Sequence, residues 1–139
     1  MSATRMAHRS LLQTSGMAHR KTRDRRSSYV VIVHSDSDPI VIAEYLATLS
    51  PADCDVLILD YSTPDVFQEH RHVLRWAGRH ISLSKNTDVI RAAIELSACE
   101  KIIVASDDVR YSVGDIEMMC QLLEKHDVCL LYTSPSPRD

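Results

Sequence analysis

The amino-acid sequence predicts an α/β domain in which a parallel sheet is covered by helices. Three observations support this fold class. Short apolar runs alternate with helix-like segments four times between residues 29 and 128. The apolar runs lack the polar–apolar alternation of a half-exposed strand, so both faces of each strand are expected to be buried. The segments between the runs have room for one helical crossover each, as a parallel sheet requires.

The first strand and helix are predicted from a sharp change in pattern at Tyr29. The run YVVIV (Tyr29–Val33) is rich in β-branched residues and ends in the polar loop HSDSDP, as expected of a buried strand followed by a loop. Pro39 is placed to open a helix, because proline is favoured in the first helical turn. Ile42, Leu46 and Leu49 then recur on one helical face.

The second strand and the second helix are predicted from the same kinds of pattern. DVLILD (Asp55–Asp60) predicts another buried strand. The segment Ser62–Asp65 offers both a capping side chain and a proline for a helix that reaches about Trp76. Gly78 is expected to end this unit before the third strand.

Two further pairs complete the alternation. HISLS (His80–Ser84) predicts the third strand, and Asn86 or Thr87 is expected to cap the third helix. KIIVAS (Lys101–Ser106) predicts the fourth strand. A fourth helix is expected near Val113–His126.

Composition excludes several classes of protein. The chain has 139 residues, 45% hydrophobic and 25% charged, which is typical of one globular domain. The longest apolar run has five residues, whereas a bilayer-spanning helix needs roughly 20. We therefore expect no transmembrane segment. The four cysteines form no CxxC pair and have no metal-type spacing, which favours reduced thiols and a cytoplasmic location.

Charge divides the chain into unequal parts. Residues 1–28 carry seven Lys/Arg against one acid and have no apolar periodicity, so we expect a disordered basic tail. Residues 29–128 carry eight Lys/Arg against 17 Asp/Glu. An acidic domain is a poor partner for nucleic acid, whose binding depends on neutralising phosphates. We therefore expect no nucleic-acid partner.

Acidic residues follow three of the four predicted strands: Asp36 and Asp38 after the first, Asp60 after the second, and Asp107 with Asp108 after the fourth. The carboxyl ends of parallel strands meet at one edge of the sheet, where ligands bind near a switch in strand order. We predict the strand order 3-2-1-4, which places Asp60 and Asp107 on the same edge. Clustered carboxylates there suit a divalent cation.

Three segments carry a resemblance to a known family. They are VVIVHSDSDP, LILDYSTPD and AAIELSACEKIIVASDDV. Over about 100 residues the chain resembles the GT-A glycosyltransferases, especially the large inverting family that includes many bacterial polysaccharide enzymes. The resemblance implies the Rossmann-like, nucleotide-sugar-binding half of such an enzyme, in truncated form. The chain departs from the family pattern at Ser106, where the acidic triplet usually begins with Asp, and at Asp38, where the family often has Arg.

The resemblance also implies roles for individual residues. Asp60 would accept a hydrogen bond from the nucleotide base, and Ser35 and Asp36 would border the nucleotide. Asp107 and Asp108 would be the DxD-type acids, with Asp108 the direct ligand of Mg²⁺ or Mn²⁺. Such an ion stabilises the negative charge that develops on the leaving nucleoside diphosphate. The catalytic base of the family lies beyond the matched segments, so we expect no catalytic residue in this chain and no sugar transfer to an acceptor hydroxyl.

Three other functions are compatible with the sequence. A metal-independent GT-A branching enzyme would suit HSDSDP and LILDYS, and would make Asp107–Asp108 a structural turn. A non-catalytic α/β binding module is a second possibility. A receiver-like domain with Asp60 as phosphoacceptor is a third, although the 24 residues from Asp36 to Asp60 hold one helix where a receiver has two helices and a strand.

The last eleven residues have a different origin in our interpretation. CLLYTSPSPRD (residues 129–139) resembles the translated adapter of a transposase-based sequencing library. We expect a non-native, proline-rich tail there, in which Cys129–Tyr132 could add a fifth strand by accident. We also expect residues 133–139 to pack on nothing.

Overall fold

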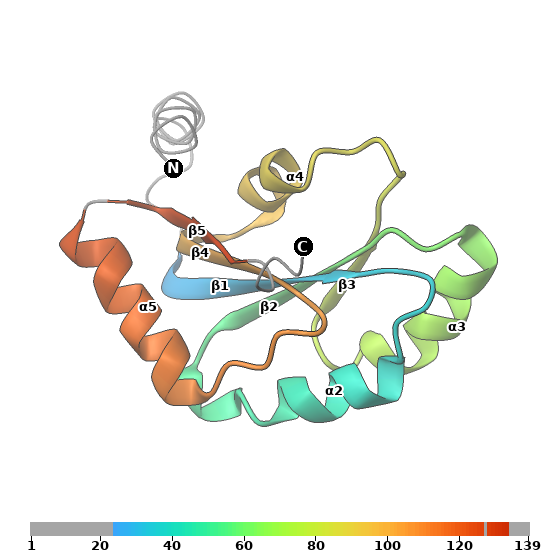
Figure 1. The fold of residues 1–139 in the computed structure, drawn as a ribbon, viewed down its shortest axis with the longest axis horizontal. Coiled ribbons are helices and arrows are strands. Elements are labelled where there is room, and N and C mark those ends of the chain that lie inside the picture. Colours follow the sequence, from blue (N-terminus) through green and yellow to red (C-terminus); the bar gives the residue numbers. More distant parts are fainter. Residues whose placement is uncertain (1–23, 127, 134–139) are drawn as a thin grey trace, which may run out of the picture.

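The computed structural model describes residues 24–126 and 128–133, and these form one parallel sheet covered by helices (Figure 1). The strand order is β3-β2-β1-β4-β5, so the predicted order of the first four strands is confirmed. Every neighbouring pair is parallel. The strands are β1 (Asp24–Val33), β2 (Asp55–Asp60), β3 (Arg79–Ser82), β4 (Cys99–Ser106) and β5 (Leu130–Tyr132).

Four α-helices cover the two faces of the sheet unequally (Figure 1). Helices α2, α3 and α5 pack on one face, and α4 covers the other. Successive residues of β1 serve the two faces in turn: Tyr29 and Val31 belong to the core under α2, whereas Val30 belongs to the core under α4. The helices are α2 (Pro39–Ala47), α3 (Pro64–Leu74), α4 (Val89–Leu96) and α5 (Val113–Lys125), with a short 3₁₀ helix, η2 (Ser50–Ala52).

Local chemistry sets the helix starts. The Asp38 carboxylate accepts from the backbone N–H groups of Ile40 and Val41 at 3.0 and 3.4 Å, and Pro39 occupies the first helical position. Asp38 is therefore the cap of α2. The expectation that Asn86 or Thr87 caps the third helix is wrong, because Asp88 is the N-cap of α4. A carboxylate at this position also opposes the positive end of the helix dipole.

The first strand begins earlier than its apolar run. β1 starts at Asp24, so residues 24–28 belong to the sheet and not to the tail expected over residues 1–28. Ser28 is fully buried, and its hydroxyl lies 2.6 Å from that of Ser97. The polar start of β1 pairs with β4, Asp24 with Cys99 and Ser27 with Lys101, which allows a polar stretch to continue a strand that apolar patterning alone would end. Residues 1–23 lie outside the described residues.

Part of the expected C-terminal tail also joins the sheet. Leu130–Tyr132 pairs with β4, and the Thr133 amide donates to the Val104 carbonyl at 2.7 Å, so the expectation that residue 133 packs on nothing is wrong. Residues 134–139 lie outside the described part of the chain. Because α5 shares a face with α2 while β5 lies beyond β4, the β4–α5–β5 connection has the opposite hand to the β1–α2–β2 connection. Such reversed connections are rare in parallel sheets.

No helix among the described residues combines the length and apolar character needed to cross a membrane. Gly78 precedes β3 where the chain passes close to β2. A Cβ at this position would lie 2.8 Å from the Val56 carbonyl oxygen, so only glycine fits the close approach.

Candidate functional site at the carboxyl edge of the sheet

The carboxyl ends of β1, β2 and β4 lie side by side. Val33 is paired with Asp60, and Ile32 is paired with Ser106. The prediction that Asp60 and Asp107 share one edge of the sheet is therefore confirmed. The site residues that the sequence predicts lie at the end of β2 (Asp60) and in the loops that follow β1 and β4.

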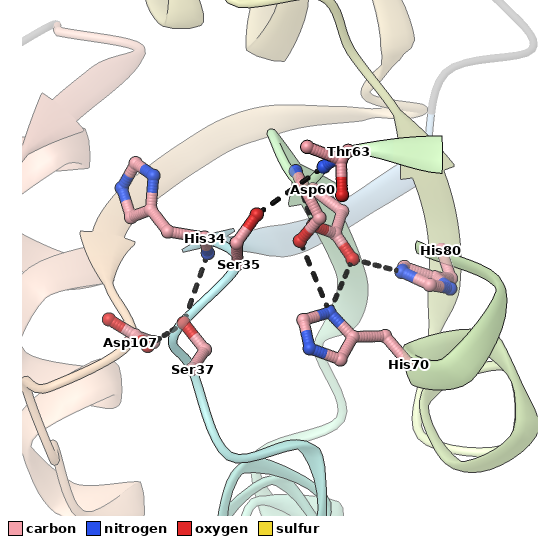
Figure 2. Close-up of polar contacts among 9 residues, drawn as sticks. His34, Ser35, Ser37, Asp60, Thr63, His70, His80 and Asp107 are labelled. Atoms are coloured by element: carbon pink, nitrogen blue, oxygen red, sulfur yellow. Dashed lines mark hydrogen bonds and ion pairs between the residues drawn. The ribbon is translucent and has the colours of Figure 1, made fainter. Parts of the chain in front are cut away.

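Asp60 is fully buried and its carboxylate is saturated with hydrogen bonds (Figure 2). One oxygen accepts from the Ser62 amide at 2.9 Å and from the Ser62 hydroxyl at 2.5 Å. The other lies 2.9 Å from His70 Nδ1 and 2.7 Å from His80 Nε2. Since an ionised carboxylate has about four acceptor positions, none remains open for a ligand.

These donors keep Asp60 ionised. Burial pushes its pKa upward, but the hydrogen bonds from His80, Ser62 and His70 together outweigh burial and hold the pKa at about 2. The His80 ring also stacks on Phe67, with centroids 4.3 Å apart. Among the described residues, its Nδ1 is a buried atom without a hydrogen-bond partner. The cluster ties the end of β2 to α3 and β3.

Sequence reasoning missed the two histidine partners of Asp60. A signal was present for one of them: His70 shares the buried face of α3 with Phe67 and Leu74, at spacings that place all three toward the core. A histidine in such a position requires a buried hydrogen-bond partner. For His80, which lies in a four-residue strand, we find no comparable signal.

The loop after β1 (residues 34–38, the first loop) is joined to the loop after β4 (residues 107–112, the acidic loop) by a serine that the sequence did not single out. Ser37 Oγ accepts from the His34 amide at 3.0 Å and donates to the Asp107 carboxylate (Figure 2). Of the predicted residues in this loop, Ser35 accepts from the Thr63 amide at 3.3 Å, and Asp36 is exposed in the turn. Ser37 therefore connects Asp107 to the first loop. The Asp60 carboxylate is bonded instead to Ser62, His70 and His80.

The acidic loop presents two carboxylates of different exposure. Asp107 is half-buried and Asp108 is exposed. The Ser106 hydroxyl donates to Asp108 Oδ1 at 2.5 Å. The Arg110 guanidinium donates to the backbone carbonyls of Asp107 and Val109, so Arg110 is engaged within its own loop.

Asp107 and Asp108 do not by themselves form a complete set of ligands for a divalent cation. Within residues 24–126 and 128–133, no group of three or more His, Cys, Asp or Glu side chains could hold a metal ion. Mg²⁺ is usually bound through one or two carboxylates together with waters and substrate phosphates. Asp107 and Asp108 satisfy that lesser requirement, so the loop fits an ion that arrives with a phosphate ligand and does not fit a metal held by protein side chains alone.

A cavity of about 680 Å³ opens at this edge on the α4 side of the sheet. It lies between the ends of β1 and β4, where the strand order switches direction, and such crevices are the usual ligand sites of open α/β sheets. The His34 and Tyr61 rings on its wall are stacked, with centroids 5.9 Å apart. Its lining also includes Ser35, Lys85, Ser106 and Val89, the first residue of α4.

A larger cavity, of about 830 Å³, lies at the opposite edge beside Trp76 and Arg79. It contains none of the strand-end loops that carry the predicted site residues. The 680 Å³ cavity on the α4 side of the sheet is therefore the candidate site. Its volume is within the 300–1,000 Å³ that is typical of small-molecule pockets.

No protein-family model matches the chain, and neither the curated proteins nor the solved structures contain a match to it. The glycosyltransferase assignment therefore remains a prediction from the sequence motifs. The receiver-like alternative is wrong, because the receiver sheet has the order 2-1-3-4-5 and this sheet has the order 3-2-1-4-5. Asp60 is also buried with both oxygens occupied, whereas a phosphoacceptor must be accessible.

Proposed function

We propose that this chain binds the nucleotide part of a nucleotide-sugar, together with Mg²⁺ or Mn²⁺, as the donor-binding part of a GT-A glycosyltransferase. One observation carries the proposal: the 680 Å³ cavity lies at the switch point between β1 and β4, bordered by Ser35 and Ser106. Ser106 is followed directly by Asp107 and Asp108. Asp107 and Asp108 therefore lie at the same edge of the sheet as the cavity, although neither side chain lines it.

The residues around the cavity have chemistry suited to a nucleotide. The stacked His34 and Tyr61 rings offer an apolar, planar wall of the kind on which a base can stack. Lys85 adds a positive charge that would attract phosphate. Asp108 is the exposed carboxylate of the acidic loop and the better placed metal ligand, with Asp107 held beside it by Ser37. When bound, the ion supplies charge stabilisation on the diphosphate.

The proposal changes the role of Asp60. A direct contact with the base would require Asp60 to give up a hydrogen bond from Ser62, His70 or His80, and a buried charge that loses a partner is costly. We assign Asp60 to holding the end of β2 in place, so that Tyr61 is fixed on the cavity wall. Base recognition then falls to the groups that line the cavity.

A metal-independent branching-type enzyme is the second candidate. The observation that favours it is that both acidic side chains already have local partners, Ser37 for Asp107 and Ser106 for Asp108. In that case the acidic loop is a turn leading to α5, and nucleotide binding requires no ion.

Titration calorimetry with UDP, with and without Mn²⁺, distinguishes the two candidates. We expect binding by the unsubstituted chain only with Mn²⁺, and at least a tenfold loss of affinity (about 1.4 kcal/mol) in Asp108→Asn, since the substitution removes the negative charge of the proposed metal ligand. Glu69→Gln is the matched control, because it removes an exposed acid on α3 that does not line the candidate cavity. We expect it to bind within about twofold of the unsubstituted chain.

Two results would contradict the proposal. Binding that is independent of Mn²⁺ and survives Asp108→Asn would favour the branching-type alternative. A chain that circular dichroism shows to be folded, yet that binds no UDP under either condition, would remove both candidates.

A further inference from the structure

Tyr45, in the last turn of α2, holds the loop that follows β4. Its hydroxyl donates to the Tyr111 carbonyl at 2.8 Å and accepts from the Tyr111 amide at 2.8 Å. A third partner, the Tyr29 hydroxyl, lies at 3.1 Å. One donor and two acceptor positions are all that a hydroxyl has, so the Tyr45 hydroxyl is fully used, and two of its three bonds go to one residue of the loop.

The Tyr45 ring makes a second attachment to the same loop. The Arg110 guanidinium carbon lies 5.0 Å from the ring centroid, within the range of a cation–π interaction. The same guanidinium donates to the carbonyls of Asp107 and Val109. The ring therefore steadies the cation that closes the acidic loop upon itself.

A third attachment comes from the turn that precedes α2. Ser37 donates to the Asp107 carboxylate, and Asp38 then caps the helix. The turn before α2 and the last turn of α2 thus both hold the segment from Asp107 to Tyr111. These attachments cross the switch point between β1 and β4 on the α2 face of the sheet, whereas the candidate cavity opens on the α4 face.

We infer that Tyr45 is a positioning residue for the acidic loop, acting on Asp107 and Asp108 through Tyr111 and Arg110. The consequence for ligand binding rests on the proposed function, whereas the consequence for loop order does not. Metal and phosphate ligands must be held within a fraction of an ångström to bind well. A loop that loses two backbone hydrogen bonds to a rigid helix samples more conformations and presents its carboxylates less often in the binding arrangement.

Tyr45→Phe tests the inference because it keeps the ring, and with it the Arg110 contact, while removing only the hydroxyl. Hydrogen exchange of the Tyr111 amide is the first readout. We expect it to become about tenfold faster, as the loss of one hydrogen bond of about 1.4 kcal/mol implies. Amides of β1 and β4 should show the same exchange as before once global stability is taken into account. The second readout is the affinity for UDP with Mn²⁺, which should weaken by about tenfold.

Tyr29→Phe is the matched control. It removes a tyrosine hydroxyl from the same cluster but leaves both Tyr45–Tyr111 hydrogen bonds intact. We expect the Tyr111 amide and the UDP affinity each to stay within about twofold of the unsubstituted chain. If the loss of any tyrosine hydroxyl from this cluster disturbed the core, both variants would show the same change.

The outcomes separate this inference from the proposed function. Unchanged Tyr111 exchange in Tyr45→Phe, or equal effects in the two variants, would overturn the positioning role. Faster exchange with unchanged UDP affinity would also overturn it, because the loop would then not control the ligand. If the unsubstituted chain binds no UDP, the proposed function fails, and selective loss of Tyr111 protection in Tyr45→Phe still establishes that Tyr45 orders the loop.

Discussion

Asp60 after β2 and Asp108 after β4 lie on the same edge of the sheet and have opposite surroundings. Asp60 has no exposed surface and accepts four hydrogen bonds from Ser62, His70 and His80. Asp108 is exposed and accepts one, from Ser106. A buried carboxylate depends on every donor it has, because each loss leaves charge uncompensated in a medium of low polarity. An exposed one exchanges its partners with water at little cost.

The comparison separates two uses of an acidic strand end. The buried Asp60 carboxylate joins β2 to α3 through His70 and to β3 through His80. The Asp108 carboxylate is exposed, and under the proposed function it would be accessible to a phosphate-bound metal ion. Both positions read alike in the sequence, as an Asp that follows an apolar run. Burial and hydrogen-bond donors, and not residue type, decide which of them is available to a ligand.

The largest expected effect is that of Asp60→Asn on stability. The amide replaces one acceptor oxygen with a donor nitrogen, which leaves at least one of the surrounding donors unpaired in the core. Removing one partner from a buried charged cluster costs about 3–5 kcal/mol. Urea unfolding at pH 7 measures the free energy of unfolding directly. A loss below about 1 kcal/mol would show that the cluster does not hold this end of the sheet together.

Acid should remove a smaller part of the same stabilisation. The pKa of Asp60 is lowered from an ordinary value of 3.8 to about 2 in the folded chain. A depressed folded pKa stabilises the protein above the unfolded pKa, and this stabilisation is lost as pH falls from about 4 towards 2. The shift corresponds to about 2 kcal/mol. Urea unfolding repeated at several pH values in this window measures the loss.

Ser62→Ala is the matched variant for the acid experiment. It removes the hydroxyl that donates to Asp60 at 2.5 Å while the Ser62 amide still donates at 2.9 Å. With one donor fewer, the pKa of Asp60 should rise, so stability should begin to fall at a higher pH than in the unsubstituted chain. Superimposable pH profiles between pH 2 and 4 would contradict the assignment of the low pKa to these hydrogen bonds.

Much of the fold followed from local pattern. The alternation of apolar runs and amphipathic segments predicted the α/β class, and the strand order 3-2-1-4 was correct. The helices begin close to Pro39, Pro64 and Val113, where proline or a capping box favours a start. The start of β1 was misplaced by five residues, because residues 24–28 are polar and are held in the sheet by pairing with β4, which only Ser28 combines with pairing to β2.

The partners within the site could not be predicted in the same way. Asp107 meets Ser37 from 70 residues away in the sequence, and Tyr45 meets Tyr111 from 66 residues away. Such contacts depend on which strands are neighbours and on how far each loop projects past its strand. Sequence motifs identified the acids at the edge, but which acid is enclosed by donors is decided by side chains on α3 and β3 that no motif links to them.

The smallest expected effect is that of Asp108→Asn on stability. The substitution alters one hydrogen bond at an exposed position, from Ser106 Oγ, and an asparagine oxygen or water can replace the acceptor. Surface changes of this kind alter the free energy of unfolding by less than about 0.5 kcal/mol. Measured in the same urea experiment as Asp60→Asn, this variant should unfold at nearly the denaturant concentration of the unsubstituted chain. A loss above about 1 kcal/mol would mean that Asp108 supports the turn into α5. The acidic loop would then resemble the Asp60 cluster in its use, and the metal-independent alternative would gain the support that the metal-binding proposal loses.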